Sequence, residues 1–427
     1  MKVVVSRLLF SVVAALSVSL AAGGFVSPGY AKGYKLKTVY SFCSEDNCTD
    51  GQNPQGLLLD PSGKVIYGTT MFGGAHGGGT AFTLTRNKHG KWKHAKIYDF
   101  ACSGLCPGGW VPTTGKLIRD TAGNLYGTTQ RGGVGDSGGG YELVKSGKTW
   151  QFKALYDACQ TDHCADGRGS EGLTYSGADA GDAYDGVSPL YGASETDGSL
   201  NEGVFFSLTP NGGNWTKAIF YTLHGAGTGG RLALDSAGDF FGIAYHLPTG
   251  SAFLFELQKT SGQWGIHTLH TFSGTADGVR PLSPLLLDAS ENIFGATQAG
   301  GDSQIIGGGG GVVFQWDGST FNTVEAFCSV ENCKDGYAPQ GGPTSDAGGN
   351  VIGTVSEGGK YGWGAVYSND GSSTTLLYSF CKKQSGDSCP DGSEPYGEVL
   401  ADGSGNIFGM TYNDAVGPNG EIFELTP

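Results

Sequence analysis

The sequence is short of positive charge, of charged residues in general and of methionine. Lys and Arg number 26 against 40 Asp and Glu, which gives a net charge of −14. This deficit argues against nucleic acid or anionic lipid as a partner, because polyanions are bound by excess positive charge. Charged residues make up only 15% of the chain and Met occurs 3 times, which argues against an ordinary mixture of globular domains.

Beyond its N-terminal region the chain also lacks an apolar run long enough to cross a membrane, which takes about 20 residues. The one long run, Leu8–Ala22, follows two basic residues and precedes small ones. This pattern is typical of a secretory signal peptide, with cleavage expected after Ala22 or after Ala31. We therefore predict that residues 1–31 are a signal peptide and that 32–427 form a single secreted or periplasmic domain without a membrane span.

Common catalytic signatures are missing as well. The chain has no Gly-x-Ser-x-Gly elbow, no His-Glu-x-x-His helix and no phosphate or dinucleotide loop in a usable context. Its Gly-Gly pairs lie between predicted strands, so no helix N-terminus is expected to receive an anion. The sequence favours a protein that is not an enzyme, and it predicts no cofactor.

Glycine and aromatic residues are abundant and regularly placed. The 77 glycines have no three-residue period, which excludes collagen, and the spaced aromatics argue against disorder. An aromatic or apolar residue followed by Gly recurs seven times at intervals of about 49 to 65 residues. The seven copies begin at Tyr67, Tyr126, Tyr191, Phe241, Phe294, Ile352 and Phe408. Each is followed by a second aromatic, at Phe82, Tyr141, Phe206, Phe255, Phe314, Tyr367 and Phe423.

Each repeat reads as four short strands separated by turn residues. The first predicted strand of the chain, Lys35–Phe42, matches the fourth strand of a repeat, and the last, Glu421–Leu425, matches a third strand. The pattern predicts an all-β protein, a seven-bladed β-propeller of four-stranded antiparallel blades. An N-terminal outer strand would join the C-terminal blade and close the ring. A stacked solenoid, the alternative, would need polar caps that are not visible.

One stretch carries a family resemblance. The segment from Asp120 to Thr129, Asp-Thr-Ala-Gly-Asn-Leu-Tyr-Gly-Thr-Thr, with Gly132 and Gly133 after it, resembles the repeat of the GloVer-type tandem repeat family of secreted bacterial proteins. The resemblance extends over the chain after the signal segment and implies export and a repeated β fold. It names no reaction, because it brings no catalytic residue set. Such proteins often end in a sorting anchor that is not seen here, which favours release or a periplasmic location.

The ten cysteines form five close pairs, each just after the fourth strand of a repeat. In an exported chain this placement predicts five local disulfides, with metal binding by thiolates as the alternative. Their loops should emerge on the same face as the Gly-rich loops between the second and third strands. We call this the disulfide face, and the opposite face, with its short Asp-Gly-type turns, the turn face. The predicted pairs are Cys43–Cys48, Cys102–Cys106, Cys159–Cys164, Cys328–Cys333 and Cys381–Cys389.

Several loops on the disulfide face carry candidate ligand-binding residues. Asp-Gly closes the Cys loop or its equivalent at Asp50, Asp166, Asp277, Asp335 and Asp391. A ring of carboxylates could bind calcium or a cationic ligand, although Asp-Gly also simply makes a turn. No metal ligand set is predicted. The candidates for ligand binding are His76, His163, Asp166, Asp335 and Asp391.

The fourth repeat departs most from the consensus. It has no cysteines and replaces the usual small residues with Tyr245 and His246. A repeat that breaks its own rule is a place to look for function. Together with His224 and Arg231, these residues could supply a base, a carboxylate clamp and a proton donor for chemistry on an acidic sugar. Ordinary drift of a repeat is the alternative.

These observations favour a secreted binding or interaction propeller. Its ligand, a glycan, a peptide or a partner protein, would meet the loops of the disulfide face, since loops on a rigid scaffold commonly bind ligands. One alternative is a propeller enzyme, a polysaccharide lyase or glycosidase, acting near the central opening. Another is a structural envelope protein. The turn face is expected to be structural.

Overall fold

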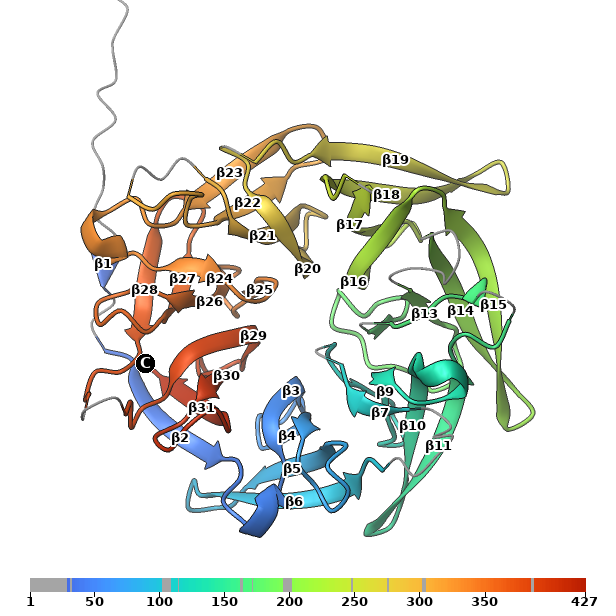
Figure 1. Cartoon of the computed structure of the whole chain (residues 1–427), viewed down its shortest axis with the longest axis horizontal. Coiled ribbons are helices and arrows are strands. Elements are labelled where there is room, and N and C mark those ends of the chain that lie inside the picture. Colours follow the sequence, from blue (N-terminus) through green and yellow to red (C-terminus); the bar gives the residue numbers. More distant parts are fainter. Residues whose placement is uncertain are drawn as a thin grey trace, which may run out of the picture.

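The computed structural model describes residues 29–30, 33–101, 109–113, 115–161, 164–170, 172–194, 202–246, 249–274, 276–301, 305–384 and 388–427. Within these ranges the strands form seven sheets arranged around a central axis like the blades of a propeller (Figure 1). Each sheet is antiparallel from its inner strand to its outer strand. This confirms the predicted fold class.

Each of the first four blades runs from an inner strand beside the axis to an outer strand. Blade 1 consists of β3 (Gln52–Leu59), β4 (Val65–Phe72), β5 (Thr80–Arg86) and β6 (Trp92–Asp99). Blade 2 consists of β7 (Trp110–Pro112) with β8 (Ile118–Arg119), β9 (Leu125–Arg131), β10 (Gly139–Ser146) and β11 (Thr149–Asp157). Blade 3 consists of β12 (Leu173–Thr174), β13 (Leu190–Ala193), β14 (Gly203–Asn211) and β15 (Asn214–Leu223), and blade 4 of β16 (Ala226–Leu234), β17 (Phe240–His246), β18 (Ala252–Thr260) and β19 (Gln263–Thr271).

The last three blades complete the ring. Blade 5 consists of β20 (Val279–Leu287), β21 (Ile293–Ala299), β22 (Val312–Trp316) and β23 (Phe321–Ala326). Blade 6 consists of β24 (Tyr337–Pro339) with β25 (Thr344–Ser345), β26 (Val351–Glu357), β27 (Ala365–Asn369) and β28 (Thr374–Ser379). Blade 7 consists of β29 (Ser393–Ala401), β30 (Ile407–Asn413), β31 (Glu421–Thr426) and, from the other end of the chain, β2 (Lys35–Ser41).

The two ends of the described chain close the ring in blade 7. The strand β2 pairs antiparallel with β31, from Lys35 opposite Thr426 to Ser41 opposite Glu421. The N-terminal strand is therefore the outermost strand of the C-terminal blade, as predicted. This pairing covers the edge that β31 would otherwise leave open.

Most of the predicted signal peptide lies outside the described residues. Gly29–Tyr30 (β1) pairs in parallel with the outer strand of blade 6, opposite Thr375 and Leu376. No helix within the described ranges is long and apolar enough to cross a membrane. The signal peptide, its cleavage site and the domain boundaries stay predictions.

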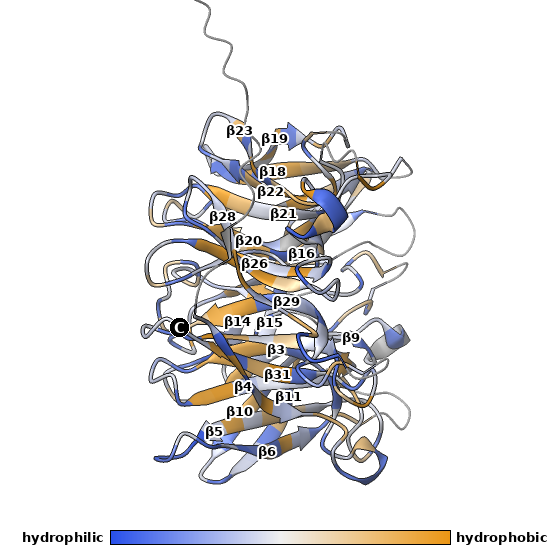
Figure 2. Ribbon diagram, turned by 90° about the vertical axis from the view of Figure 1, so that its left-hand side faces the viewer, coloured by the Kyte–Doolittle hydropathy of each residue, from blue (hydrophilic) through white to orange (hydrophobic). Residues whose placement is uncertain are grey.

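The apolar core lies between the blades. Buried side chains form seven clusters, and each cluster joins two neighbouring blades. The cluster between blades 7 and 1, for example, packs Phe408 and Ile422 against Ile66 and Phe82. Figure 2 shows hydrophobic residues along the strands and hydrophilic residues mainly in the loops at both faces. Each blade thus buries its two sides against its neighbours, which is how a sheet with two apolar faces is stabilised.

The repeated glycine and the repeated second aromatic are cross-strand partners. In every blade the Gly of the second strand lies opposite the aromatic residue of the third. A Cβ on any of these glycines would lie 2.6 Å or less from an atom of that aromatic side chain. The glycine is required because the ring lies across its backbone, which explains why the two residues repeat together. The pairs are Gly68–Phe82, Gly127–Tyr141, Gly192–Phe206, Gly242–Phe255, Gly295–Phe314, Gly353–Tyr367 and Gly409–Phe423.

A second feature joins five of the blades to the one before them on the disulfide face. The second residue of the inner strand has a positive φ of 55–58° at Asn53, Val111, Ala338 and Glu394. Its backbone N–H donates to a carbonyl in the Gly-rich loop of the preceding blade, over 2.8–3.1 Å. A non-Gly residue in this conformation is strained, and the hydrogen bond offsets the strain. In blade 4 the contact is made instead by Thr228, whose Oγ1 donates to the Ser194 carbonyl at 2.6 Å.

Candidate functional site: the central cavity

A cavity of about 550 Å³ lies on the propeller axis, at the ends of the inner strands that lead to the turn face. This volume falls within the range of small-molecule sites. All seven blades contribute to its wall. The contributors, one from each blade in order, are Leu58, Leu117, Leu173, Arg231, Leu285, Thr344 and Glu398.

Irregular inner strands form the end of the cavity that lies inside the molecule. The pairing of the inner strand shifts register in blades 1, 4, 5 and 7, and in blades 2 and 6 the strand breaks into two pieces. At this level the backbones of neighbouring blades touch, and Gly397 N–H donates to the Gln340 carbonyl at 2.9 Å. Likewise, a Cβ on Gly56 would lie 2.6 Å from the Gly115 carbonyl oxygen. Backbone segments of neighbouring blades therefore touch around the axis, next to the residues that line the cavity and on their disulfide-face side.

One position of the repeat supplies charged side chains beside these backbone contacts. Lys116, Arg231 and Glu398 each stand four residues before the Asp that begins the turn of their blade, and all three line the cavity. The same position is Gly56 in blade 1 and Gly342 in blade 6. Small residues there let neighbouring backbones approach, whereas the three long side chains bring two cations and one anion to the axis.

Arg231 is held by the insertion of blade 3, which spans 176–188. Both terminal nitrogens donate to Asp179 Oδ1, at 3.2 and 3.3 Å, and Asp179 Oδ2 accepts the Leu234 N–H at 2.9 Å. Burial alone would lower the pKa of Arg231, but the charges of Asp179 and Glu398 outweigh it and raise that pKa. The guanidinium therefore stays charged, in a fixed orientation, at the cavity wall.

The insertion of blade 3 is fixed to blade 2 as well as to blade 4. The Tyr184 carbonyl accepts the Thr121 N–H at 3.0 Å, and the Tyr184 ring packs edge-on against Tyr126 at 5.3 Å. Tyr175, just before the insertion, donates from its hydroxyl to the Asp182 carbonyl at 2.6 Å and lines the cavity. The insertion thus forms a wall with an aromatic ring and two acidic residues.

Two further cations line the cavity from blade 2. Lys116 and Arg119 form no ion pair within the described part of the chain. The Arg119 guanidinium lies over the Tyr67 ring, 5.7 Å from its centroid. The nearby Asp60 and Asp120 accept backbone N–H groups within their own turns. They line the same cavity, as do the carboxylates of Asp179, Asp182 and Glu398. The two cations of blade 2 therefore stand in a wall of mixed charge.

The four residues singled out in the fourth repeat have four different partners. His224, 79% exposed, contacts Glu202 at 2.8 Å. Tyr245 donates to the Pro281 carbonyl of blade 5 at 2.6 Å, and His246 stacks on Phe253 at 4.5 Å. Only Arg231 of the four lines the central cavity. Their joint catalytic role stays a prediction.

The predicted ligand-binding residues of the disulfide face lie in its loops. His76 is exposed between β4 and β5, and His163 lies outside the described residues. Asp166 accepts the Thr161 N–H and hydroxyl, and Asp335 accepts the same two groups of Ser329. Asp391 accepts the Tyr378 hydroxyl at 2.6 Å and the Lys382 N–H at 3.1 Å. Among the described residues no group of three or more His, Cys, Asp or Glu is placed to hold a metal ion.

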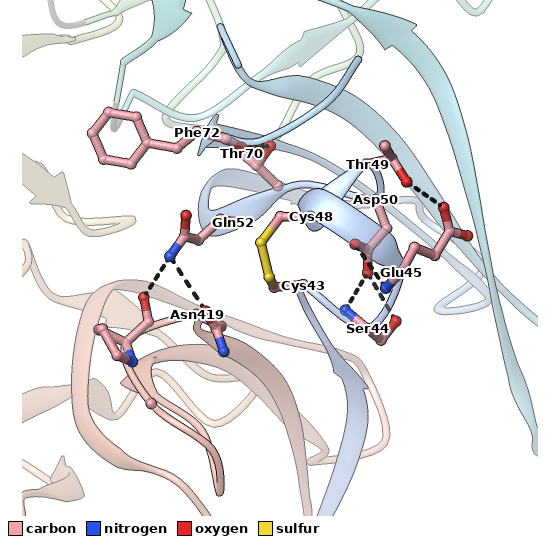
Figure 3. Close-up of a disulfide and its surroundings, with 12 residues drawn as sticks. Cys43, Ser44, Glu45, Cys48, Thr49, Asp50, Gln52, Thr70, Phe72 and Asn419 are labelled. Atoms are coloured by element: carbon pink, nitrogen blue, oxygen red, sulfur yellow. Dashed lines mark hydrogen bonds between the residues drawn. A yellow bond between two sulfur atoms is a disulfide. The ribbon is translucent and has the colours of Figure 1, made fainter. Parts of the chain in front are cut away.

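Four of the five predicted disulfides are present: Cys43–Cys48, Cys159–Cys164, Cys328–Cys333 and Cys381–Cys389. The pair Cys102–Cys106 lies outside the described residues. Figure 3 shows the first bridge closing the loop into β3, with Asp50 binding back to Ser44 and Gln52 reaching Asn419 of blade 7. The loops are thus fixed both internally and to the neighbouring blade.

Comparison with known proteins matches this chain to a repeat family. Residues 16–247 and 230–427 match the Gloeobacter/Verrucomicrobia repeat. No curated protein matches the chain. Among solved structures, the polysaccharide lyase Uly1 is 10% identical over 95% of this chain and 94% of its own, with a TM-score of 0.49. An α-L-arabinofuranosidase from Fusarium graminearum is 12% identical over 73% of this chain and 91% of its own, with a TM-score of 0.42. At such identities a shared fold does not indicate a shared reaction.

Proposed function

Because the chain belongs to the Gloeobacter/Verrucomicrobia repeat family, and its repeats form a closed ring around a charged cavity, we propose that it is a binding protein for a small carboxylate-bearing sugar. The observation that carries this proposal is that Lys116, Arg231 and Glu398 share one repeat position and meet around the axis.

The side chains around the cavity suit an acidic sugar. A carboxylate would be bound by Lys116 and Arg119 through charge-assisted hydrogen bonds. Hydroxyl groups would find an acceptor in Glu398, and the Tyr175 ring offers an apolar face with a polar tip. Arg231, already fixed by Asp179, would add a directed donor without further ordering cost.

Calorimetry with glucuronate and galacturonate, against their neutral hexose counterparts, tests the proposal. We expect the uronates to bind about tenfold or more tightly than the hexoses. Lys116→Ala and Arg119→Gln should each weaken uronate binding by about the same factor. Arg131→Gln is the matched control, because Arg131 is 61% exposed on the disulfide face and should leave affinity unchanged. Equal affinity for uronate and hexose would overturn the proposal.

The other functions considered from the sequence stay proposals. A lyase or glycosidase using His224, Arg231, Tyr245 and His246 would release product from an acidic polysaccharide, so the protein is also incubated with polygalacturonate and assayed for new reducing ends or unsaturated products. Product release by the protein but not by His246→Ala would replace binding with catalysis. The separate partners of the four residues are the reason we put binding first.

A partner on the disulfide face, whether glycan, peptide or protein, is a second proposal. Phe72 and Tyr412 are each 45% exposed at the ends of their strands on that face, and exposed aromatics are common in binding surfaces. A purely structural envelope role would leave both surfaces without ligands. We also propose secretion or a periplasmic location, supported by the four disulfides, which persist in oxidising compartments.

A further inference from the structure

A groove of about 600 Å³ lies at the seam between blades 1 and 2. Blade 1 contributes Tyr67, the hydroxyls of Thr83 and Thr85, and Ile97. Blade 2 contributes the hairpin between β10 and β11, which ends in Trp150. The groove therefore combines hydroxyl groups and an aromatic ring in a concave surface between two blades.

The groove is basic in a chain whose net charge is −14. Its lining includes Lys96, Lys145 and Lys148 and no acidic residue. Of these, Lys96 pairs with Asp99 at 3.0 Å. The remaining local surplus of positive charge creates an attractive field for anions that the net charge conceals.

Three lysines at the groove have no acidic partner within the described residues: Lys93, Lys145 and Lys148. Lys145 and Lys148 line the groove directly, and the Lys145 ammonium lies 5.5 Å from the centroid of the Trp150 ring. Lys93 stands two residues before Ala95, which lines the groove, and alternate residues of a strand share one face. Lys93 of blade 1 is thus on the strand face that borders the groove, across the seam from Lys145 and Lys148 of blade 2.

One pair of side chains lies between the groove and the central cavity. Tyr67 lines the groove, and the guanidinium that lies over its ring, 5.7 Å from the centroid, belongs to Arg119. Arg119 in turn lines the cavity together with Lys116. Positive charge therefore stands on both sides of this pair, in the groove and in the cavity.

We propose that the groove binds an acidic polysaccharide whose chain runs along the seam between blades 1 and 2 and whose terminal sugar enters the central cavity. The entry of the terminal sugar into the cavity rests on the function proposed above, whereas binding in the groove is argued from the groove's own residues. The concave shape and the hydroxyl groups suit a chain of anionic sugars, and Trp150 provides an apolar surface for a sugar ring.

Titration with oligogalacturonides of increasing length tests the groove. We expect longer oligomers to bind about tenfold or more tightly than galacturonate itself, with an affinity that falls as salt is added. Lys145→Gln with Lys148→Gln should abolish this gain and leave the affinity for the monomer unchanged. Lys382→Gln with Lys383→Gln removes two exposed lysines from the disulfide face and is the matched control.

The outcomes separate the two proposals. If the protein binds long oligomers but not the monomer, the cavity assignment fails and the groove stands. If it binds the monomer and length adds nothing, or if both double variants lose the same affinity, the groove assignment fails. Dextran sulfate that binds as tightly as oligogalacturonide would show that the groove also accepts sulfated sugars. Equally tight binding of neutral dextran or of single-stranded DNA would overturn the proposal that the ligand is an acidic polysaccharide.

Discussion

Glu421 is a buried carboxyl at a position where the other blades have small or apolar residues. Its equivalents, two residues before the repeated aromatic, are Thr80, Gly139, Val204, Phe253, Val312 and Ala365. Glu421 is 1% exposed, its Oε1 has no hydrogen-bond partner among the described residues, and its Oε2 lies 3.5 Å from the Thr38 and Ser41 hydroxyls. Burial, with added repulsion from Asp414 and Asp391, raises its pKa to about 8.

Stability should therefore fall as pH rises through the range between the unfolded and folded pKa values of Glu421. Between about pH 4.5 and 8 the folded state holds a proton that the unfolded state has lost, so unfolding becomes easier by about 1.4 kcal/mol per pH unit at most. Glu421→Gln should remove this slope and raise the melting temperature at pH 8 but not at pH 4. Thermal melts of both proteins across this pH range test the prediction, and parallel curves would contradict it.

Arg231 is the one cavity residue that the sequence identified as a candidate site residue. It stood out because the fourth repeat is irregular. Aligning the repeats on the turn Asp would also have found Lys116 and Glu398, since all three occupy one position. Asp179 could not have been found in this way. It stands 52 residues before Arg231 in an insertion without a counterpart in other repeats, and only the fold brings the two together.

At the scale of the blade, the repeat pattern was sufficient to predict the strands. The Tyr/Phe-Gly motif and the following aromatic predicted adjacent strands, and the structure makes them direct partners. The joint between blades was not predictable, because a positive φ at residues as different as Asn53, Val111 and Glu394 has no sequence signature. The cavity was not predicted either, because it depends on how seven inner strands bulge together on the turn face.

The cross-strand glycines provide a test of this packing. Gly295→Ala should destabilise the protein by about 1–3 kcal/mol, because a Cβ there would overlap the Phe314 ring and approach Leu285 Cδ2 at 2.9 Å. Gly265→Ala, in β19, is the control, since a Cβ there meets nothing within 4 Å and the backbone φ is not positive. Chemical denaturation measures both. Equal stability of the two variants would show that the ring can move aside.

At the scale of the whole molecule, β2 holds the ring closed. Leu36 packs in the cluster between blades 6 and 7, and Tyr40 in the cluster between blades 7 and 1. At the turn-face end of the same closure, Glu424 of β31 accepts the Trp92 indole N–H at 3.2 Å and pairs with Arg86, both from blade 1. This strand and this carboxylate thus add to the loop and core contacts that link the first blade to the last.

A chain that begins at Phe42 lacks β2 and should associate further than one that keeps it. The free edge of β31 would pair with other molecules, so we expect a larger particle mass by light scattering and a lower melting temperature. A chain that begins at Gly33 keeps β2 and is the control. A synthetic peptide of residues 33–41 should reverse both changes by adding the missing strand. The same particle mass and melting temperature for both chains would show that the ring closes without β2.

The shared position of Lys116, Arg231 and Glu398 has a consequence for how such a protein could diversify. The three copies that carry long side chains can be replaced without altering the aromatic pairs that stabilise their blades. A new ligand preference would then need only point substitutions at these copies, while the scaffold stays constant. Descendants of one ancestral ring could therefore share their architecture and differ in the chemistry at its centre.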